Sequence, residues 1–205
     1  MGLVLHIIRH GEVYNPDEIL YARLPHFHLS ATGRKQAVAA ARYLIDRPIT
    51  YIYSSPMVRA QETATYIAVP HLNTDVILEE RINEIYSPYE GVKLSELEKR
   101  GFRLYDDIDK EYENEQDIFT RVWDFISECR QKHDGEEIVA VTHGDVVVFS
   151  FLYSRGVELK VQTAGDLQRI HGLGDPYPAT AAINTLRFHT DHPDELPEHE
   201  YFRPY

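Results

Sequence analysis

Two apolar runs in this chain each end in a histidine that is followed by a glycine. The first run starts at Leu3 and ends in Arg9-His10-Gly11, and the second covers 138–142 and ends in His143-Gly144. Runs of this length, rich in Val, Ile and Leu and broken by glycine, predict buried strands. In open α/β sheets, ligands bind at the carboxyl ends of the strands. We therefore expect both histidines at one edge of the same sheet, beside a ligand.

An arginine directly before the first histidine indicates that this ligand carries phosphate. A guanidinium group can hold phosphate oxygens through two parallel hydrogen bonds, and an imidazole can attack phosphorus or donate a proton. Arg59 follows the next predicted strand, 49–54, near the start of a helix that we expect to have Ser55 as N-cap and Pro56 as its first residue. A cation is unfavourable at a helix N-terminus, and a bound anion would relieve this cost. The alternative is an Arg59 side chain in solvent.

Two further segments carry candidate site residues. The loop 14–29 contains prolines, aromatic side chains and Arg23, which would contact a substrate anion or lie in solvent. The run that starts at Val76 is followed by glutamates, one of which could act as a general acid if its pKa is raised. These are Glu79, Glu80, Glu84 and Glu90. His26 and His28 have no partner at metal-ligand spacing, so we expect no metal site there.

The order of the predicted elements is typical of one α/β domain that spans residues 1–205. The pattern predicts a last strand within 180–189. Besides the helix that contains Arg59, it predicts three more helices. They are 30–46 with Ser30 as N-cap, an amphipathic stretch around 118–129, and a helix after Gly144.

Three segments are predicted to lie outside the regular core. Residues 94–132 are an acidic helical insertion, within which 106–117 is a candidate lid. Residues 160–178 are a connection that contains glycine and proline. The tail, 190–205, combines three prolines with many acidic side chains, so we expect it on the surface or poorly ordered. Substrate specificity would lie in 94–117, in 160–178 and in the loop 14–28.

Charge and composition restrict the partners that the chain can bind. The formal net charge of −12 disfavours nucleic acid and anionic membrane surfaces. No apolar run reaches the roughly 18–20 residues that span a bilayer, and the N-terminus lacks the pattern of a secretory signal. The single cysteine, Cys129, excludes an internal disulfide and fits a reducing cytoplasm. We expect a cytoplasmic protein whose basic groups gather around a small anionic substrate, and the oligomeric state stays open.

Five short motifs follow one another along most of the chain. They are Arg9-His10-Gly11 with Asn15, LSATGRKQA at 29–37, SPMVRAQETA at 55–64, Ile82-Asn83-Glu84 with Glu90-Gly91, and Val141-Thr142-His143-Gly144. In this order, the motifs resemble those of the histidine phosphatase superfamily, which is also called the phosphoglycerate mutase-like family. A match of five ordered motifs is far more specific than any one of them.

The resemblance implies a three-layer sandwich in which helices cover both faces of a mostly parallel central sheet. It implies that His10 is the nucleophile that becomes phosphohistidine and that Glu84 donates a proton to the leaving alcohol. Arg9, Arg59 and His143 would complete the catalytic residues by forming the phosphate pocket. With Arg23, the predicted substrate contacts are Arg9, Asn15, Arg59, His143 and Gly144. Because a cationic pocket stabilises charge on the transferring phosphoryl group, we expect no metal ion and no cofactor.

We predict a phosphoric monoester hydrolase of the histidine acid phosphatase type that acts on a small phosphorylated metabolite. Two alternatives are a cofactor-dependent mutase of the phosphoglycerate mutase kind and a phosphate-binding interaction module without turnover. Ala22-Arg23 stands where the mutases carry small substrate-contacting residues, which disfavours the mutase. Two other departures from the family pattern are Ser87, between the two glutamates, and Asp145, after the second histidine, where glycine is common.

Overall fold

The computed structural model describes residues 2–156, 177–190, 192 and 194–205. A six-stranded sheet forms its centre, with the strand order β3-β2-β4-β1-β5-β6. The strands are β1 (Val4–Arg9), β2 (Ile49–Ser54), β3 (Val76–Leu78), β4 (Glu137–Thr142), β5 (Ile183–Arg187) and β6 (Glu198–Phe202). The first four are parallel, whereas β5 is antiparallel to β1 and β6 is antiparallel to β5. The predicted mostly parallel sheet is confirmed.

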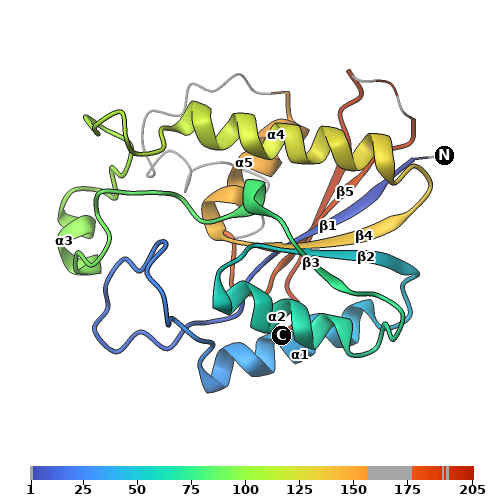
Figure 1. Ribbon diagram of the computed structural model, residues 1–205, viewed down its shortest axis with the longest axis horizontal. Helices are drawn as coiled ribbons and strands as arrows, with labels where there is room; N and C mark the ends of the chain where they lie inside the picture. The colour runs from blue at the N-terminus through green and yellow to red at the C-terminus, as the bar shows by residue number, and fades with distance from the viewer. Residues whose placement is uncertain (1, 157–176, 191, 193) are drawn as a thin grey trace.

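Helices cover both faces of this sheet, as Figure 1 shows. They are α1 (Ala31–Leu44), α2 (Val58–Ala68), the 3-10 helix η1 (Glu80–Ile82), α3 (Leu94–Lys99), α4 (Glu115–Lys132) and α5 (Gly144–Ser154). The helices α1 and α2 lie on one face, and α4 and α5 lie on the other. The three-layer prediction is therefore confirmed.

The central strands β1 and β4 are mainly apolar because both of their faces are buried. Successive side chains of a strand point to opposite faces of the sheet. In β4, Ile138 and Ala140 join the core beneath α4 and α5, while Val139 and Val141 join the core beneath α1 and α2. Two hydrophobic cores on a shared sheet thus hold β1, β2 and β4 in register.

The first turn of α1 is packed against the chain that follows β1. The Ser30 hydroxyl caps the helix by accepting a hydrogen bond from the backbone N–H of Gly33 at 2.9 Å. A Cβ at Gly33 would lie 2.0 Å from the carbonyl oxygen of Glu12, and a Cβ at Gly11 would lie 2.5 Å from the carbonyl oxygen of Gly33. Glycine at both positions therefore permits a backbone contact that fixes the segment directly after His10.

The structure corrects one sequence prediction and adds one strand. The helix α2 begins at Val58 with Met57 as N-cap, so Ser55 and Pro56 lie before it. The Ser55 hydroxyl instead contacts the ring of His143. In the tail, 198–202 forms the edge strand β6 against β5 at the surface, which is one of the two outcomes that we expected, but the strand itself was not predicted. The side chains of β6 alternate between exposed and half-buried, which is typical of an edge strand. In the sequence, the prolines and acidic residues of the tail obscure this alternation.

The structure also places most of the segments that were predicted to lie outside the regular core. The amphipathic stretch forms α4, and within 94–132 only α3 and α4 are helical. The connection 160–178 lies outside the described residues except for its last two positions. In Figure 1, α3 and the loop 14–29 lie beyond the carboxyl ends of the parallel strands. Among the described helices, none is long and apolar enough to cross a bilayer.

We predict that Gly33→Ala lowers the free energy of unfolding by about 1–3 kcal/mol, because the added methyl group overpacks the contact with Glu12. In an unobstructed helix the same change stabilises by up to about 1 kcal/mol, so the sign of the effect is diagnostic. Urea denaturation measures it. The control Thr32→Ala, at an exposed neighbouring position, should shift stability by less than about 0.5 kcal/mol. A stabilised Gly33→Ala protein would contradict the close contact.

Candidate active site

Three parallel strands end beside one another and bring the predicted histidines together. Arg9 at the end of β1 lies opposite Thr142 at the end of β4, and Ser54 of β2 lies opposite Val141. His10 follows directly, and its backbone N–H donates to the carbonyl oxygen of Thr142 at 2.8 Å. The ring centroids of His10 and His143 are 5.2 Å apart. The strand pattern therefore predicted this meeting correctly.

The His10 ring is oriented so that Nε2 presents a lone pair to the site. Its Nδ1 lies 2.8 Å from the carbonyl oxygen of Gly11, and because a carbonyl only accepts, Nδ1 carries the proton. Nε2 accepts a hydrogen bond from Nε of Arg59 at 3.2 Å. Burial, and then the charge of Arg59, lowers the pKa of His10 well below its usual value. The imidazole is therefore neutral at physiological pH, as a nucleophile must be.

Arg59, the second residue of α2, contacts most of the other site residues. Its side chain is completely buried. Nη2 donates to the carbonyl oxygen of Ala22 at 2.7 Å, and it also lies 3.4 Å from Oε2 of Glu84 and 3.2 Å from Nδ1 of His143. The Tyr21 ring packs over the guanidinium group, 4.7 Å from its central carbon. The prediction of an arginine that faces the site rather than solvent is confirmed.

Two guanidinium nitrogens at this site are buried and have no hydrogen-bond partner among the described residues. They are Nη1 of Arg59 and Nε of Arg9. The other end of the Arg9 group is held, because its Nη1 donates to the carbonyl oxygen of Pro178 at 2.7 Å. A buried donor without a partner costs about 1–3 kcal/mol, and more for a charged group. A phosphate oxygen would satisfy these donors, so the geometry is that of an anion pocket.

Glu84 and His143 face one another across the pocket. Oε2 of Glu84 lies 3.2 Å from Nδ1 of His143. On the other side of the ring, Nε2 lies 2.7 Å from the hydroxyl of Ser55, which donates to Oδ1 of Asn83 at 3.3 Å. The serine oxygen therefore accepts from Nε2–H, which leaves Nδ1 as the acceptor. A proton placed between Nδ1 and Oε2 would be shared by both side chains.

The charges around this pair set its protonation state. Burial by itself would raise the pKa of the Glu84 carboxyl, but the charge of Arg59 and the hydrogen bond from the backbone N–H of Ile85 lower it below its usual range. Burial lowers the pKa of His143 to about 4, although the Glu84 carboxylate opposes this shift. At neutral pH, these shifts leave Glu84 ionised and His143 uncharged.

The structure distinguishes Glu84 from the other candidate glutamates. Its carboxylate accepts from the backbone N–H of Ile85 at 3.0 Å and reaches Arg59. The side chains of the other three bind elsewhere: Glu79 to Arg81, Glu80 to Asn83, and Glu90 to the backbone of Arg23. The choice of Glu84 rested on the family resemblance, and the geometry agrees with it.

Arg23 has partners that differ from those expected for a substrate contact. Its Nε donates to the carbonyl oxygen of Glu84 at 2.7 Å, and its Nη2 donates to Oε2 of Glu113 at 2.8 Å. The same Glu113 carboxylate pairs with Arg121 at 2.9 Å. Arg23 thus holds the backbone that carries Glu84. A direct contact between Arg23 and a substrate stays a prediction.

Asn15 and Gly144 are also placed by local packing. The Asn15 side chain forms hydrogen bonds of 2.9 and 3.3 Å with the backbone of Ile19, which closes a turn of the loop 14–29. Gly144 is the first residue of α5, and a Cβ there would lie 2.1 Å from the hydroxyl of Tyr177. Their substrate-binding roles stay predictions.

Sequence reasoning missed three side chains that shape the site. Ser55 was expected to cap a helix, and no sequence signal distinguishes the two uses of its hydroxyl. Tyr21 lies in a loop with several other aromatic side chains, so the sequence could not select it. Tyr177 lies near the end of the connection 160–178, which the sequence indicated only as a segment, and its ring packs 5.0 Å from the guanidinium carbon of Arg9.

A family model described as the histidine phosphatase superfamily (branch 1) matches residues 5–193. The chain belongs to this superfamily. The resemblance seen in the five motifs is therefore confirmed over nearly the whole chain.

Relatives of this superfamily member include proteins named as phosphatases. Phosphoserine phosphatase 1 of Hydrogenobacter thermophilus is 32% identical over 149 residues, which cover 68% of this chain and 70% of the relative. An uncharacterised protein of Mycobacterium tuberculosis is 39% identical over 165 residues, which cover 76% and 80%. The solved structure of a mycobacterial glucosyl-3-phosphoglycerate phosphatase matches with a TM-score of 0.77 at 19% identity, covering 98% of each chain, which shows the shared fold.

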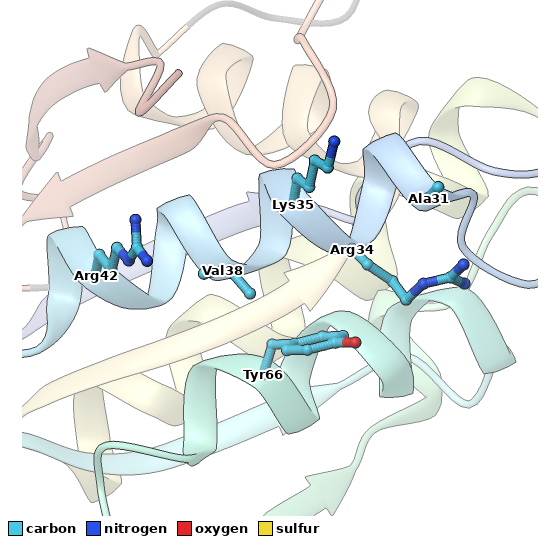
Figure 2. A pocket seen from close by; sticks show the side chains of 6 residues that line it. All are labelled: Ala31, Arg34, Lys35, Val38, Arg42 and Tyr66. Carbon is cyan, nitrogen blue, oxygen red and sulfur yellow. The ribbon is translucent and has the colours of Figure 1, made fainter.

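The molecule also has a groove that the candidate active site does not share. That groove of about 450 Å³ lies between α1 and α2 (Figure 2). Its lining residues are Ala31, Arg34, Lys35, Val38, Arg42 and Tyr66. It contains no predicted site residue, although three of its side chains are cationic.

Three donors at the site have the types found in transition-metal centres. One ligand atom from each of His10, Glu84 and His143 lies within 4.8 Å of the others. The guanidinium groups of Arg9 and Arg59 would repel a divalent cation at this position. With both guanidinium groups present, the site holds an anion at less electrostatic cost than a metal ion.

We predict that the free energy of unfolding falls as the pH is lowered from 7 to 5. The pKa of His143 is about 4 in the folded chain against an ordinary 6.5, so the unfolded chain binds more protons in this window. His143 contributes stability above pH 6.5 that is lost through this range, about 2 kcal/mol between pH 7 and 5. Urea denaturation at both pH values measures it. An equal fall in His143→Gln would contradict a neutral, buried His143.

Proposed function

We propose that this chain is a phosphatase that hydrolyses a small phosphomonoester through a phosphohistidine on His10. The observation that carries the proposal is the orientation of His10. Its Nδ1 is tied to the Gly11 carbonyl, and its Nε2 lone pair faces Arg59 beside two unpartnered guanidinium nitrogens. A phosphoryl group seated on those nitrogens would lie next to the nucleophile.

In the first step, Nε2 of His10 attacks phosphorus and the bond between phosphorus and the leaving oxygen breaks. Arg9 and Arg59 stabilise the charge on the transferring oxygens, so the step needs no metal ion. Glu84 gives its proton to the departing alkoxide. In the second step, Glu84 takes a proton from water, which attacks phosphorus and releases His10 and inorganic phosphate.

Glu84 must gain a proton before the first step, although its surroundings favour the carboxylate. The phosphate supplies the change, because a dianion beside Arg59 offsets the cation that lowers the pKa of Glu84. Solvent or a singly protonated phosphate ester supplies that proton, and Nδ1 of His143, 3.2 Å away, is placed to accept a hydrogen bond from the protonated carboxyl. Substrate binding and the protonation of Glu84 are thus coupled.

The substrate that fits this proposal is a small phosphorylated metabolite. Its leaving group would lie among Tyr21, Tyr177 and the loop 14–29. We also propose a cytoplasmic location, since Cys129 is a free, buried cysteine, and no nucleic acid or membrane partner, since the chain is strongly acidic. Relatives named as phosphoserine and glucosyl-3-phosphoglycerate phosphatases supply the first compounds to test.

We predict that His10→Ala abolishes phosphate release, by about 1,000-fold or more, because no other group replaces the nucleophile. The assay measures phosphate released from an aryl phosphate and a panel of metabolite phosphates, with chelator present. Control reactions contain His189→Ala, which changes an exposed histidine that pairs with Glu198. Activity that survives in His10→Ala, or that the chelator removes, would contradict the proposal.

Absence of release by the wild type would favour the two alternatives. A mutase would then show phosphoryl transfer in an assay supplied with a bisphosphoglycerate. A binding module would show none, but would still bind phosphate.

We predict that Glu84→Gln slows hydrolysis of alkyl phosphates by about 100- to 10,000-fold and that of aryl phosphates much less. An alkoxide needs the proton that Glu84 donates, whereas an aryl oxide leaves without it. The comparison is made at saturating substrate. Equal losses for both substrate types would remove Glu84 from the role of acid.

A further inference from the structure

Asp145, the second residue of α5, has a buried carboxylate that the mechanism above does not use. It is 5% exposed. Its Oδ1 accepts from the Tyr177 hydroxyl at 2.6 Å, and its Oδ2 accepts from the Tyr105 hydroxyl at 2.5 Å. Three segments that are distant in the sequence meet at this one side chain. We refer to Tyr105, Asp145 and Tyr177 as the tyrosine clamp.

The clamp lies directly against the phosphate pocket. The Tyr177 ring packs 5.0 Å from the guanidinium carbon of Arg9, and the neighbouring Pro178 carbonyl accepts from Nη1 of Arg9 at 2.7 Å. On its other side, the Tyr177 hydroxyl occupies the space that a side chain at position 144 would need. Tyr177 is thus held between Arg9 and Gly144.

A buried carboxylate beside an anion pocket is energetically unfavourable if its hydrogen bonds have only a structural role. Burial, and then the charge of Glu84, raises the pKa of Asp145, and a negative charge here also opposes the anion that the pocket binds. A carboxylate can, however, accept from two hydroxyl groups at once, whereas an asparagine has one acceptor oxygen. The carboxylate of Asp145 therefore offsets its electrostatic cost by holding both tyrosines in place.

We propose that Asp145 is a positioning residue for phosphoryl transfer, which acts through Tyr177 on the placement of Arg9. This inference rests on the proposed phosphatase function. The contacts of the Arg9 guanidinium group with the Tyr177 ring and the Pro178 carbonyl orient its unpartnered Nε. Tyr105 ties residues 100–114 to the same point. Asp145 touches no reacting atom, so its effect reaches the reaction through Arg9.

The proposal separates binding from turnover. Asp145→Asn removes a negative charge from the pocket, so phosphate should bind as tightly as in the wild type or more tightly. Misplaced Arg9 donors should lower kcat by about 10- to 100-fold, because transition-state contacts depend on placement more than ground-state binding does. A lower kcat without a higher KM is the expected signature.

The experiment compares Asp145→Asn, Tyr177→Phe and the double variant, with kcat and KM measured on the best substrate of the panel. Tyr177→Phe keeps the ring over Arg9 but loses the hydrogen bond, so it should reproduce the loss in kcat. The double variant should lose little more than either single variant. Tyr53→Phe is the matched control, since it removes a hydroxyl that contacts His133 at 2.9 Å. Its kcat should equal that of the wild type.

A second measurement works without turnover. Calorimetry gives the Kd values of inorganic phosphate and of vanadate, whose five-coordinate adduct resembles the transition state. Asp145→Asn should weaken vanadate relative to phosphate by about tenfold or more. An unchanged ratio and an unchanged kcat would overturn the positioning role while leaving the phosphatase intact. Wild-type protein that binds neither anion would overturn both proposals.

Discussion

The buried guanidinium group of Arg59 is the interaction on which the rest of the site depends. It contacts Nε2 of His10, Oε2 of Glu84 and Nδ1 of His143, and so links groups carried by three separate chain segments. An arginine can be buried here because the Glu84 carboxylate and the Ala22 carbonyl compensate its charge. Because its Nη1 has no partner among the described residues, the site is complete only with an anion.

This arrangement explains how a chain with a net charge of −12 would bind the phosphate ester that we propose as its substrate. The pocket gathers Arg9 from the end of β1 and Arg59 from the first turn of α2, and burial keeps both histidines neutral. Glu84 is ionised while it pairs with Arg59. A substrate phosphate that competes for Arg59 would release Glu84 to take a proton, so one ion pair couples binding to acid catalysis.

Sequence reasoning recovered the features that strand periodicity and local caps determine. Two apolar runs that end in His-Gly predicted that His10 and His143 meet, because parallel strands in register deliver their ends to one edge. It could not find Ser55 or Tyr177, because their contacts join segments about 90 and 30 residues apart and leave no local pattern. The strand β6 was missed because its acidic residues are typical of a disordered tail, whereas pairing with β5 overrides that composition.

The most direct test of this account is to trap the phosphoenzyme. Wild-type protein is mixed with substrate and quenched rapidly in alkali, since a phosphohistidine is labile in acid, and its peptides are analysed by mass spectrometry. The account predicts one phosphoryl group on the peptide that contains His10, attached at Nε2, formed at a rate no slower than turnover. A phosphoryl group on another residue, or turnover without any phosphoenzyme, would contradict it.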